Sequence, residues 1–252
     1  LNAQNFTTQT EALNETFGFG EGGSITTGTM NTLIGSEAGD VITTGFRNVA
    51  VGRDSLGANT KSNRNVAVGA FSLDALNHAT DTDGFNVAVG LSAGGAMTTG
   101  IRNSIVGALA GDSLTDSDFN VVMGYGALSG ETTGHGSVAI GFSALNVQNN
   151  GTGALTHNTA VGYNAGALIA SATLNTAVGS LALDAEVNGH RNTAVGYAAL
   201  STQQSGTSTN TENTAMGFHA GVSITSGGSN VLIGSQAGDA ITGGSNNVIV
   251  GQ

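Results

Sequence analysis

A five-residue pattern, Asn-x-apolar-apolar-Gly, recurs thirteen times in this chain of 252 residues, and successive copies begin 17 or 21 residues apart. The copies begin at Asn31, Asn48, Asn65, Asn86, Asn103, Asn120, Ser137, Asn158, Asn175, Asn192, Asn213, Asn230 and Asn247. A fixed period of this size is typical of a solenoid, in which each repeat is one coil and no coil is stable alone. The pattern predicts an all-β parallel β-solenoid or β-roll of 17- and 21-residue coils.

The apolar residues of each copy occupy both faces of a short strand. Side chains alternate along a strand, so positions 2 and 4 share one face and position 3 lies on the other. Position 4 is always a large aliphatic residue, and we expect it to point into the core. Position 3 is also always apolar, and such a strand needs a second apolar surface. That surface is either another sheet of the same coil or, as we expect, neighbouring copies of the chain.

Positions 1 and 5 have a structural interpretation. Position 5 is Gly in every copy, which suits a corner with positive φ or a close backbone approach. Position 1 is Asn in twelve copies, and its amide is suited to a hydrogen-bonded ladder from coil to coil. The structural repeat residues include Asn48, Val51, Gly52, Asn65, Val68, Gly69, Asn158, Val161, Gly162, Asn192, Val195 and Gly196.

Positions 9 and 12 vary together. Where position 9 is Gly, as at Gly39, position 12 is apolar, as at Ile42. Where position 9 is Leu, position 12 is polar, with Leu76 the exception. Overfilling or emptying a core site costs about 1–5 kcal/mol. The exchange therefore predicts a tightly packed interior that receives about one large aliphatic side chain, which we call the plug, from position 9 or 12 of each coil. This packing argues against a ligand cavity.

The repeated pattern divides the chain into two parts. A degenerate copy at residues 14–18 precedes the regular ones, so we interpret residues 1–30 as an N-terminal junction and capping coil. Residues 31–252 form the predicted rod, about 60 Å long at ~4.8 Å per coil. The chain begins with Leu1, and its last copy stops five residues in, at Gln252; we expect a piece of a longer polypeptide.

The three 21-residue repeats place four extra residues in polar loops near 77–85, 148–157 and 203–212. Loops on a rigid scaffold are common binding elements. The candidate receptor-contacting residues in these loops are Asp81, Asp83, Phe85, Asn150, His157, Thr207 and Thr209.

Two segments resemble repeats of known fibrous proteins. Residues 136–141, Gly-Ser-Val-Ala-Ile-Gly, resemble the head repeat of YadA-like trimeric autotransporter adhesins. Residues 158–166 and 192–200, Asn-Thr-Ala-Val-Gly-Tyr-x-Ala-Gly/Leu, resemble stalk repeats of phage and bacterial tail-fibre-like proteins, which often end in an endosialidase-type chaperone. The similarity extends over residues 31–251, although YadA-like heads have repeats shorter than 17 residues. It implies a left-handed β-roll and a trimer whose axis follows the rod.

Composition narrows the range of partners. Six Lys and Arg against seventeen Asp and Glu give a net charge of −11, which disfavours nucleic-acid binding. The apolar runs are too short to cross a bilayer, so we expect no membrane insertion of this segment. The chain has no Cys for disulfides or thiolate metal sites.

Sequence motifs that would indicate catalysis or ligand binding are weak. Residues 18–23 match the dinucleotide pattern G-x-G-x-x-G without the strand and helix that it needs. We interpret the histidines as solvated loop residues rather than a metal cluster. Arginines at position 17 (Arg47, Arg64, Arg102 and Arg191) leave a basic receptor patch open, whereas the Thr pairs are too interrupted for an ice-binding array. We predict no catalytic residue, cofactor or metal.

These observations favour a non-enzymatic structural segment of an extracellular trimeric fibre or adhesin. Such a segment, on a virion or a bacterial cell surface, serves attachment to a host, prey or surface. The alternative is a module that binds a glycan or protein receptor through the long-repeat loops. A glycan-cleaving spike with Asp81 and Asp83 as its acids, or an ice-binding solenoid, is disfavoured.

Overall fold

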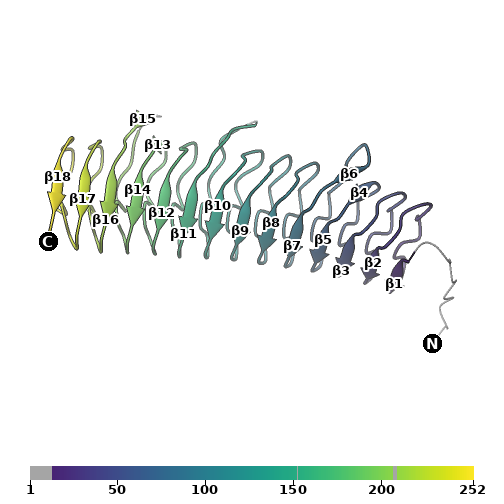
Figure 1. Ribbon diagram of the computed structural model, residues 1–252. Helices are drawn as coiled ribbons and strands as arrows, with labels where there is room; N and C mark the ends of the chain where they lie inside the picture. The colour runs from purple at the N-terminus through teal and green to yellow at the C-terminus, as the bar shows by residue number, and fades with distance from the viewer. Residues whose placement is uncertain (1–12, 152, 207–208) are drawn as a thin grey trace.

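The computed structural model describes residues 13–151, 153–206 and 209–252, and there the chain forms a parallel β-solenoid (Figure 1). Fourteen three-residue strands stack into one sheet that runs the length of the rod, and no helix occurs among the described residues. Each strand is followed by turns and bends that return the chain to the next coil. The predicted solenoid is confirmed.

The main sheet contains β1 (Glu15–Phe17), β2 (Thr32–Ile34), β3 (Val49–Val51), β5 (Val66–Val68), β7 (Val87–Val89), β8 (Ser104–Val106), β9 (Val121–Met123), β10 (Val138–Ile140), β11 (Thr159–Val161), β12 (Thr176–Val178), β14 (Thr193–Val195), β16 (Thr214–Met216), β17 (Val231–Ile233) and β18 (Val248–Val250). Two small sheets pair β4 (Ser62–Asn63) with β6 (Thr82–Asp83) and β13 (Gly189–His190) with β15 (Thr209–Asn210). The degenerate first copy is the outermost strand, because β1 pairs with β2.

The face of each strand that points into the core is the opposite of the one that we expected. Position 3 is the buried residue, as at Ala50 and Ala160, which are 0% exposed. Position 4 lies on the outer face, and Ile34 and Met123 there are 40% and 47% exposed. The prediction that position 4 points into the core was therefore wrong. The position-4 residues that it affects include Val51, Val68, Val161 and Val195, which are half-buried.

The interior has little room for position 3 because the plugs at positions 9 and 12 fill it. Leu56 and Ile42, from the two alternative positions, are both completely buried. A Cβ at Gly39 would lie 2.8 Å from Cδ1 of Ile42, so Gly at position 9 makes room for the apolar residue at position 12 of this coil; the coil with Leu73 and Leu76, both completely buried, is the exception. The predicted exchange between the two positions is confirmed as packing.

A ladder of buried asparagines runs along the rod from Asn14 to Asn247. Asn48 is representative: Oδ1 of Asn31 accepts its backbone N–H at 3.0 Å and its side-chain N–H at 3.2 Å. The same amide donates to the carbonyl oxygen of Ser62 at 2.9 Å, which ties the far side of the coil to the strand. The predicted amide ladder is confirmed, with Ser137 as its one substitution.

Both of the predicted constraints, a positive φ and a close backbone approach, require the glycine at position 5. Gly162 has φ of +141°, a region that L side chains rarely adopt. A Cβ on Gly162 would lie 2.5 Å from the carbonyl oxygen of Gly179, the equivalent residue of the next coil. The backbones of neighbouring coils therefore approach closely at this corner.

We predict that Gly162→Ala is far more destabilising than Gly151→Ala. Both glycines have positive φ, but a Cβ at Gly151 would have no described atom within 4 Å. The first substitution combines strain with a backbone clash and should cost at least ~3 kcal/mol, whereas the second should cost about 1 kcal/mol. Chemical unfolding followed by circular dichroism measures both, and equal costs would contradict the close approach.

Candidate functional site

The outer face of the main sheet is uncharged along thirteen consecutive strands. Its residues are positions 2 and 4 of β2 to β18, and all are Val, Ile, Met, Thr or Ser. Exposed sheet faces usually carry polar residues, whereas charged residues are depleted in the cores of protein interfaces. The apolar face ends at β1, where Glu15 takes the outward position. We call this surface the strand face.

Two rims border the strand face. The entry rim consists of the residue before each repeat: Met30, Arg47, Arg64, Phe85, Arg102, Phe119, Gly136, His157, Leu174, Arg191, Glu212, Ser229 and Asn246. The exit rim consists of positions 6 and 7, which follow the Gly corner. Position 6 contains Ser36, Arg53, Ala70, Leu91, Ala108, Tyr125, Phe142, Tyr163, Ser180, Tyr197, Phe218 and Ser235. Position 7 contains Glu37, Asp54, Phe71, Ser92, Leu109, Gly126, Ser143, Asn164, Leu181, Ala198, His219 and Gln236.

Aromatic side chains stack along the exit rim. Tyr125, Phe142 and Tyr163 form a continuous ladder, with ring centroids 5.7 and 5.4 Å apart and planes within 12° of parallel. Tyr197 and Phe218 form a second stack at 5.6 Å. Because these rings cover each other's faces, they present edges outward and offer no open platform for stacking a sugar ring. About half of each ring is exposed, which extends the apolar strand face sideways.

The arginines at position 17 do not form a free basic patch. Arg64 pairs with Asp83 and lies over the rings of Phe46 and Phe85. Arg191 pairs with Glu212 at 3.2 Å. Arg47 and Arg102 each lie over one phenylalanine ring, and neither has a carboxylate within ion-pair distance in the described part of the chain.

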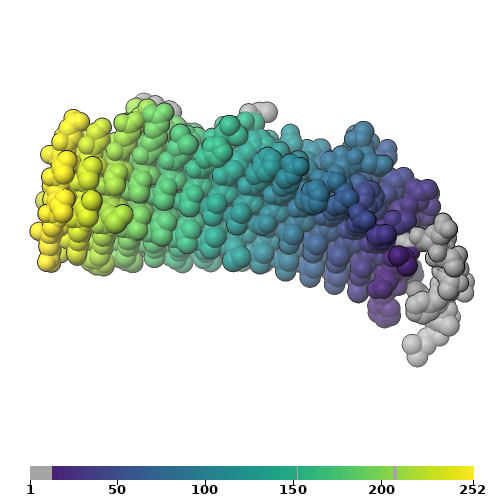
Figure 2. Space-filling model, viewed as in Figure 1, coloured from purple at the N-terminus to yellow at the C-terminus, as the bar shows by residue number. Residues whose placement is uncertain are grey.

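The candidate receptor residues are spread over three separate loops. The loops belong to coils about 14 and 19 Å apart at ~4.8 Å per coil, and they project along one long edge of the rod (Figures 1 and 2). Asp81 accepts a hydrogen bond from Oγ1 of Thr44 at 2.9 Å, and Asp83 pairs with Arg64. Both carboxylates are therefore engaged within the chain rather than paired across a groove.

The other candidates do not converge either. Asn150 donates to the carbonyl oxygen of Ser171 at 2.6 Å, His157 is exposed on the entry rim, and Thr209 is exposed in β15. Phe85, 47% exposed, is covered on one side by Arg64. Thr207 lies outside the described residues. Among the described residues, no two of the three loops come together into one site.

The base of the third loop is held by a buried carboxylate that our sequence reasoning missed. Glu186, at position 12, is 0% exposed. Its Oε1 accepts the backbone N–H groups of Val187, Asn188, Gly189 and Ser205 at 2.7–3.1 Å. Its Oε2 accepts from Gln203 at 2.7 Å and from the Ser205 hydroxyl at 3.2 Å. Burial alone would raise the pKa of Glu186, but these hydrogen bonds outweigh burial and lower it.

The second loop has the same arrangement. Glu131 is completely buried, accepts the N–H of Gly134 at 2.8 Å and binds the amide of Gln148 at 3.0 Å. Gln148 also accepts from Asn158 at 2.8 Å, which bridges the ladder where Ser137 replaces Asn. A signal was present in the sequence: Glu-x-x-Gly-His occurs at residues 131–135 and 186–190, each time with Gln seventeen residues after the Glu.

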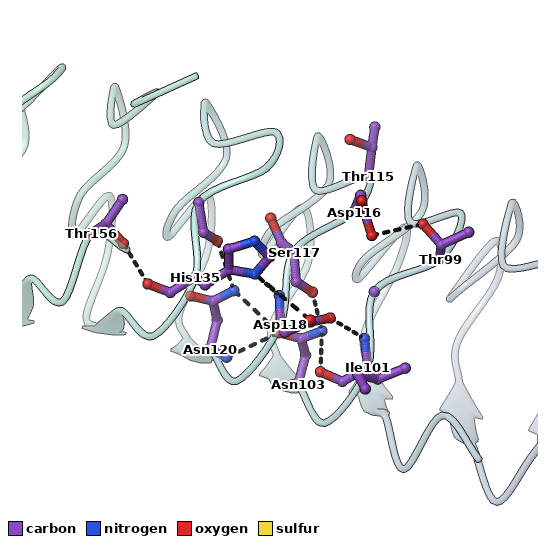
Figure 3. Close-up of polar contacts among 12 residues, drawn as sticks. Thr99, Ile101, Asn103, Thr115, Asp116, Ser117, Asp118, Asn120, His135 and Thr156 are labelled. Atoms are coloured by element: carbon purple, nitrogen blue, oxygen red, sulfur yellow. Dashed lines mark hydrogen bonds and ion pairs between the residues drawn. The ribbon is translucent and has the colours of Figure 1, made fainter. Parts of the chain in front are cut away.

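Three histidines have structural roles, and the first of them is His190, whose Nδ1 accepts the backbone N–H of Thr173 at 3.0 Å. Nδ1 of His135 accepts the backbone N–H of Asp118 at 2.8 Å, and Asp118 accepts that of Ile101 at 2.8 Å (Figure 3). His78 is 7% exposed and lies 2.6 Å from the Ser62 hydroxyl. The interpretation of the histidines as solvated loop residues was wrong for His78, His135 and His190. Among the described residues, no three His, Asp or Glu side chains are placed to hold a metal ion.

The remaining sequence motifs also serve the rod. Threonine hydroxyls donate along the axis, as from Thr43 to the carbonyl of Thr60 at 3.1 Å and from Thr99 to Asp116 at 2.8 Å (Figure 3). The glycine-rich residues 18–23 follow the exposed strand β1 and lead into turns rather than a helix. Neither feature forms a ligand site.

The fold and its uncharged face define the class of this chain as a parallel β-solenoid. Comparisons with protein-family models, curated proteins and solved structures gave no match. The described residues contain no helix that is long and apolar enough to span a membrane.

We predict that Glu186→Gln destabilises the coils around the third loop by about 2–3 kcal/mol, because the new amide would put donors against donors. The matched control is Glu212→Gln, since Glu212 is 46% exposed in a surface ion pair and should contribute less than ~1 kcal/mol. Urea unfolding of each variant measures the difference.

The advantage of the wild type over Glu186→Gln should depend on pH. Because the folded-state pKa of Glu186 is lowered, its stabilisation is full above the ordinary glutamate value of about 4.3 and is lost as pH falls through the folded value. Unfolding measured at neutral pH and in stepwise more acidic buffers tests this. A constant difference at all pH values would contradict a charged, hydrogen-bonded Glu186.

Proposed function

We propose that this chain is a structural segment of an extracellular homotrimeric fibre or adhesin used for attachment. The observation that carries the proposal is the strand face, which is uncharged and mostly apolar over thirteen strands although the chain has 23 charged residues. A surface of this kind is typical of an interface rather than of a solvated rod. The resemblance to trimeric adhesin and tail-fibre repeats supports three copies, left-handed winding and an extracellular location.

The strand face is a large surface. Thirteen strands at ~4.8 Å, with about 16 Å across the five-residue pattern, give roughly 1,000 Å² per chain. In a trimer this face is shared between two neighbours, about 500 Å² with each, so the rims must also take part to reach the ~800 Å² per partner of a standard interface. The axial repeat adds a second argument, because a partner must present side chains at the same spacing over the whole rod, and another copy of this chain does so.

A purely structural role also agrees with the rest of the surface. Asp81 and Asp83 are occupied by Thr44 and Arg64, and the exit-rim aromatics cover each other. The proposal therefore assigns attachment to the fibre as a whole, with this segment as its spacer or part of its head. Enzymatic cleavage of glycans has no geometric support in the described residues.

We predict that wild-type protein has the mass of a trimer in light scattering and that Val178→Glu lowers this mass to that of a monomer. Val178 lies on the strand face in β12, where a buried charge would be unpaired. Ala185→Glu adds the same charge in the same coil, at a turn away from the face, and should leave the mass unchanged. A wild-type chain that stays monomeric at high concentration would refute the trimer.

Receptor binding through the long loops is a second candidate function. The observation that favours it is the pair of buried glutamate networks, which hold the bases of the second and third loops firmly to the rod. Preorganised loops lose less entropy on binding a partner. Under this candidate, a glycan or protein receptor contacts the loop residues named above, including Asp81, Asn150 and Thr209.

We predict for this candidate that shortening a loop abolishes attachment without changing assembly. Residues 206–209 would be deleted, which restores a 17-residue repeat, keeps Gln203 and Ser205 on Glu186 and adds no apolar residue behind Leu200. The second variant deletes residues 151–154 of the second loop and keeps Gln148 on Glu131. Adhesion of fluorescent protein to receptor-bearing cells measures the effect. If both variants attach as the wild type does, neither of the two shortened loops is needed for binding.

A further inference from the structure

The strand face by itself specifies poorly how two copies align. Position 4 is Val, Ile or Met and position 2 is Val, Thr or Ser in every coil, so sliding one copy by a whole coil mostly exchanges one uncharged contact for a similar one. Reversing one copy also leaves apolar residues opposite apolar residues. A residue that breaks the repeat must therefore set orientation and alignment, and charges on the rims are the features that do so.

Most rim charges are already paired within the chain. Arg64 pairs with Asp83, Arg191 with Glu212, and Arg53 with Asp54 at 2.9 Å. Of the charged rim residues, Arg47, Arg102 and Glu37 have no opposite charge at ion-pair distance among the described residues. Arg47 and Glu37 lie in neighbouring coils at the same end of the rod, beside β3 and β2.

Glu37 and Asp54 interact with each other on the exit rim, where Arg53 pairs with Asp54 and Glu37 has no opposite charge at ion-pair distance. The hydrogen bond and the negative charge of Asp54 raise the pKa of Glu37, and Arg53 offsets this only in part. Arg47 lies on the entry rim, where its guanidinium lies 5.7 Å from the centroid of the Phe46 ring. The five residues between the entry rim and the exit rim span about 16 Å of extended chain, so Arg47 cannot reach Glu37 and Asp54 of its own chain.

Cyclic packing of strand faces brings opposite rims together. When copies related by a rotation about the rod axis turn their strand faces inward, the entry rim of each copy meets the exit rim of the next. We propose that copies of this chain pack in parallel with their coils level, and that Arg47 of each copy pairs with Glu37 and Asp54 of the next. This inference rests on the proposed function, because it needs an assembly through the strand face.

The pairing would exclude the main alternative alignments. In an antiparallel arrangement the two entry rims would meet, so Arg47 would lie near Ser229, between Asn246 and Glu212, and Glu212 is already paired with Arg191. In a parallel arrangement displaced by several coils, Arg47 would meet Ser92 or Leu109. The pairing of Arg47 with Glu37 and Asp54 thus fixes the orientation, and it fixes the alignment to within about one coil.

Crosslinking tests the pairing directly, because the chain has no cysteine of its own. The test variant combines Arg47→Cys with Glu37→Cys, and the matched control combines Arg102→Cys with Glu37→Cys. A disulfide needs Cα atoms within about 7 Å, which excludes a bond across one chain's strand face. We expect oxidation to convert the test variant into a closed covalent trimer on a non-reducing gel, and the control to remain uncrosslinked.

A charge exchange gives an independent measurement. Arg47→Glu should raise the concentration needed for assembly about tenfold, which corresponds to ~1.4 kcal/mol. Adding Glu37→Arg and Asp54→Arg to the same chain should restore assembly, and Arg102→Glu should have a smaller effect than Arg47→Glu. The restoration distinguishes a pair between copies from a general loss of folding.

The outcomes separate this inference from the proposed function. A wild-type trimer with no crosslinking of the test variant, or with equal crosslinking of the control, overturns the pairing and leaves the fibre proposal standing. A monomeric wild type overturns both. A covalent dimer in place of the trimer would support the rim pairing but contradict three-fold symmetry.

Discussion

The buried asparagine at the start of each coil is the interaction on which the rod depends. Its side chain accepts two hydrogen bonds from the next asparagine and donates to a carbonyl on the far side of its own coil. One residue thus fixes both the axial alignment of neighbouring strands and the width of the coil. Because the amide is fully buried, losing any one of these partners would leave a polar group unsatisfied.

The sequence pattern was sufficient to predict the repeat, the asparagine ladder and the exchange between positions 9 and 12. It was not sufficient to predict which face of each strand points into the core. An alternating strand with apolar residues on both faces has two possible orientations, and size suggested that the larger residue at position 4 was the inner one. The interior, however, receives its bulk from Leu56 or Ile42 at the turn, so the strand contributes only a small residue such as Ala50. The large side chains that fill the core come from positions 9 and 12 of the coil rather than from the strand.

The long coils were harder to read because their key residues look like surface residues. Glu, Gln and His are usually exposed, yet Glu186 and Gln203 are completely buried and hydrogen-bonded to each other. Their position in the repeat was known, but their environment depends on four backbone N–H groups that converge only after the coil has closed. The loop tips, in contrast, follow no repeat, and their candidate residues remain separate in the structure.

The inverted strand strengthens rather than weakens the case for assembly. With position 3 inside, the second apolar surface is not a small alanine face but a face with Val, Ile or Met at position 4 of every coil. Burying one such side chain contributes about 1.5–3 kcal/mol. Summed over thirteen coils, even partial burial is comparable with the 5–15 kcal/mol that stabilises a typical domain. Under the proposed assembly, folding of the rod and association of the copies are therefore one coupled equilibrium, in which stability depends on protein concentration.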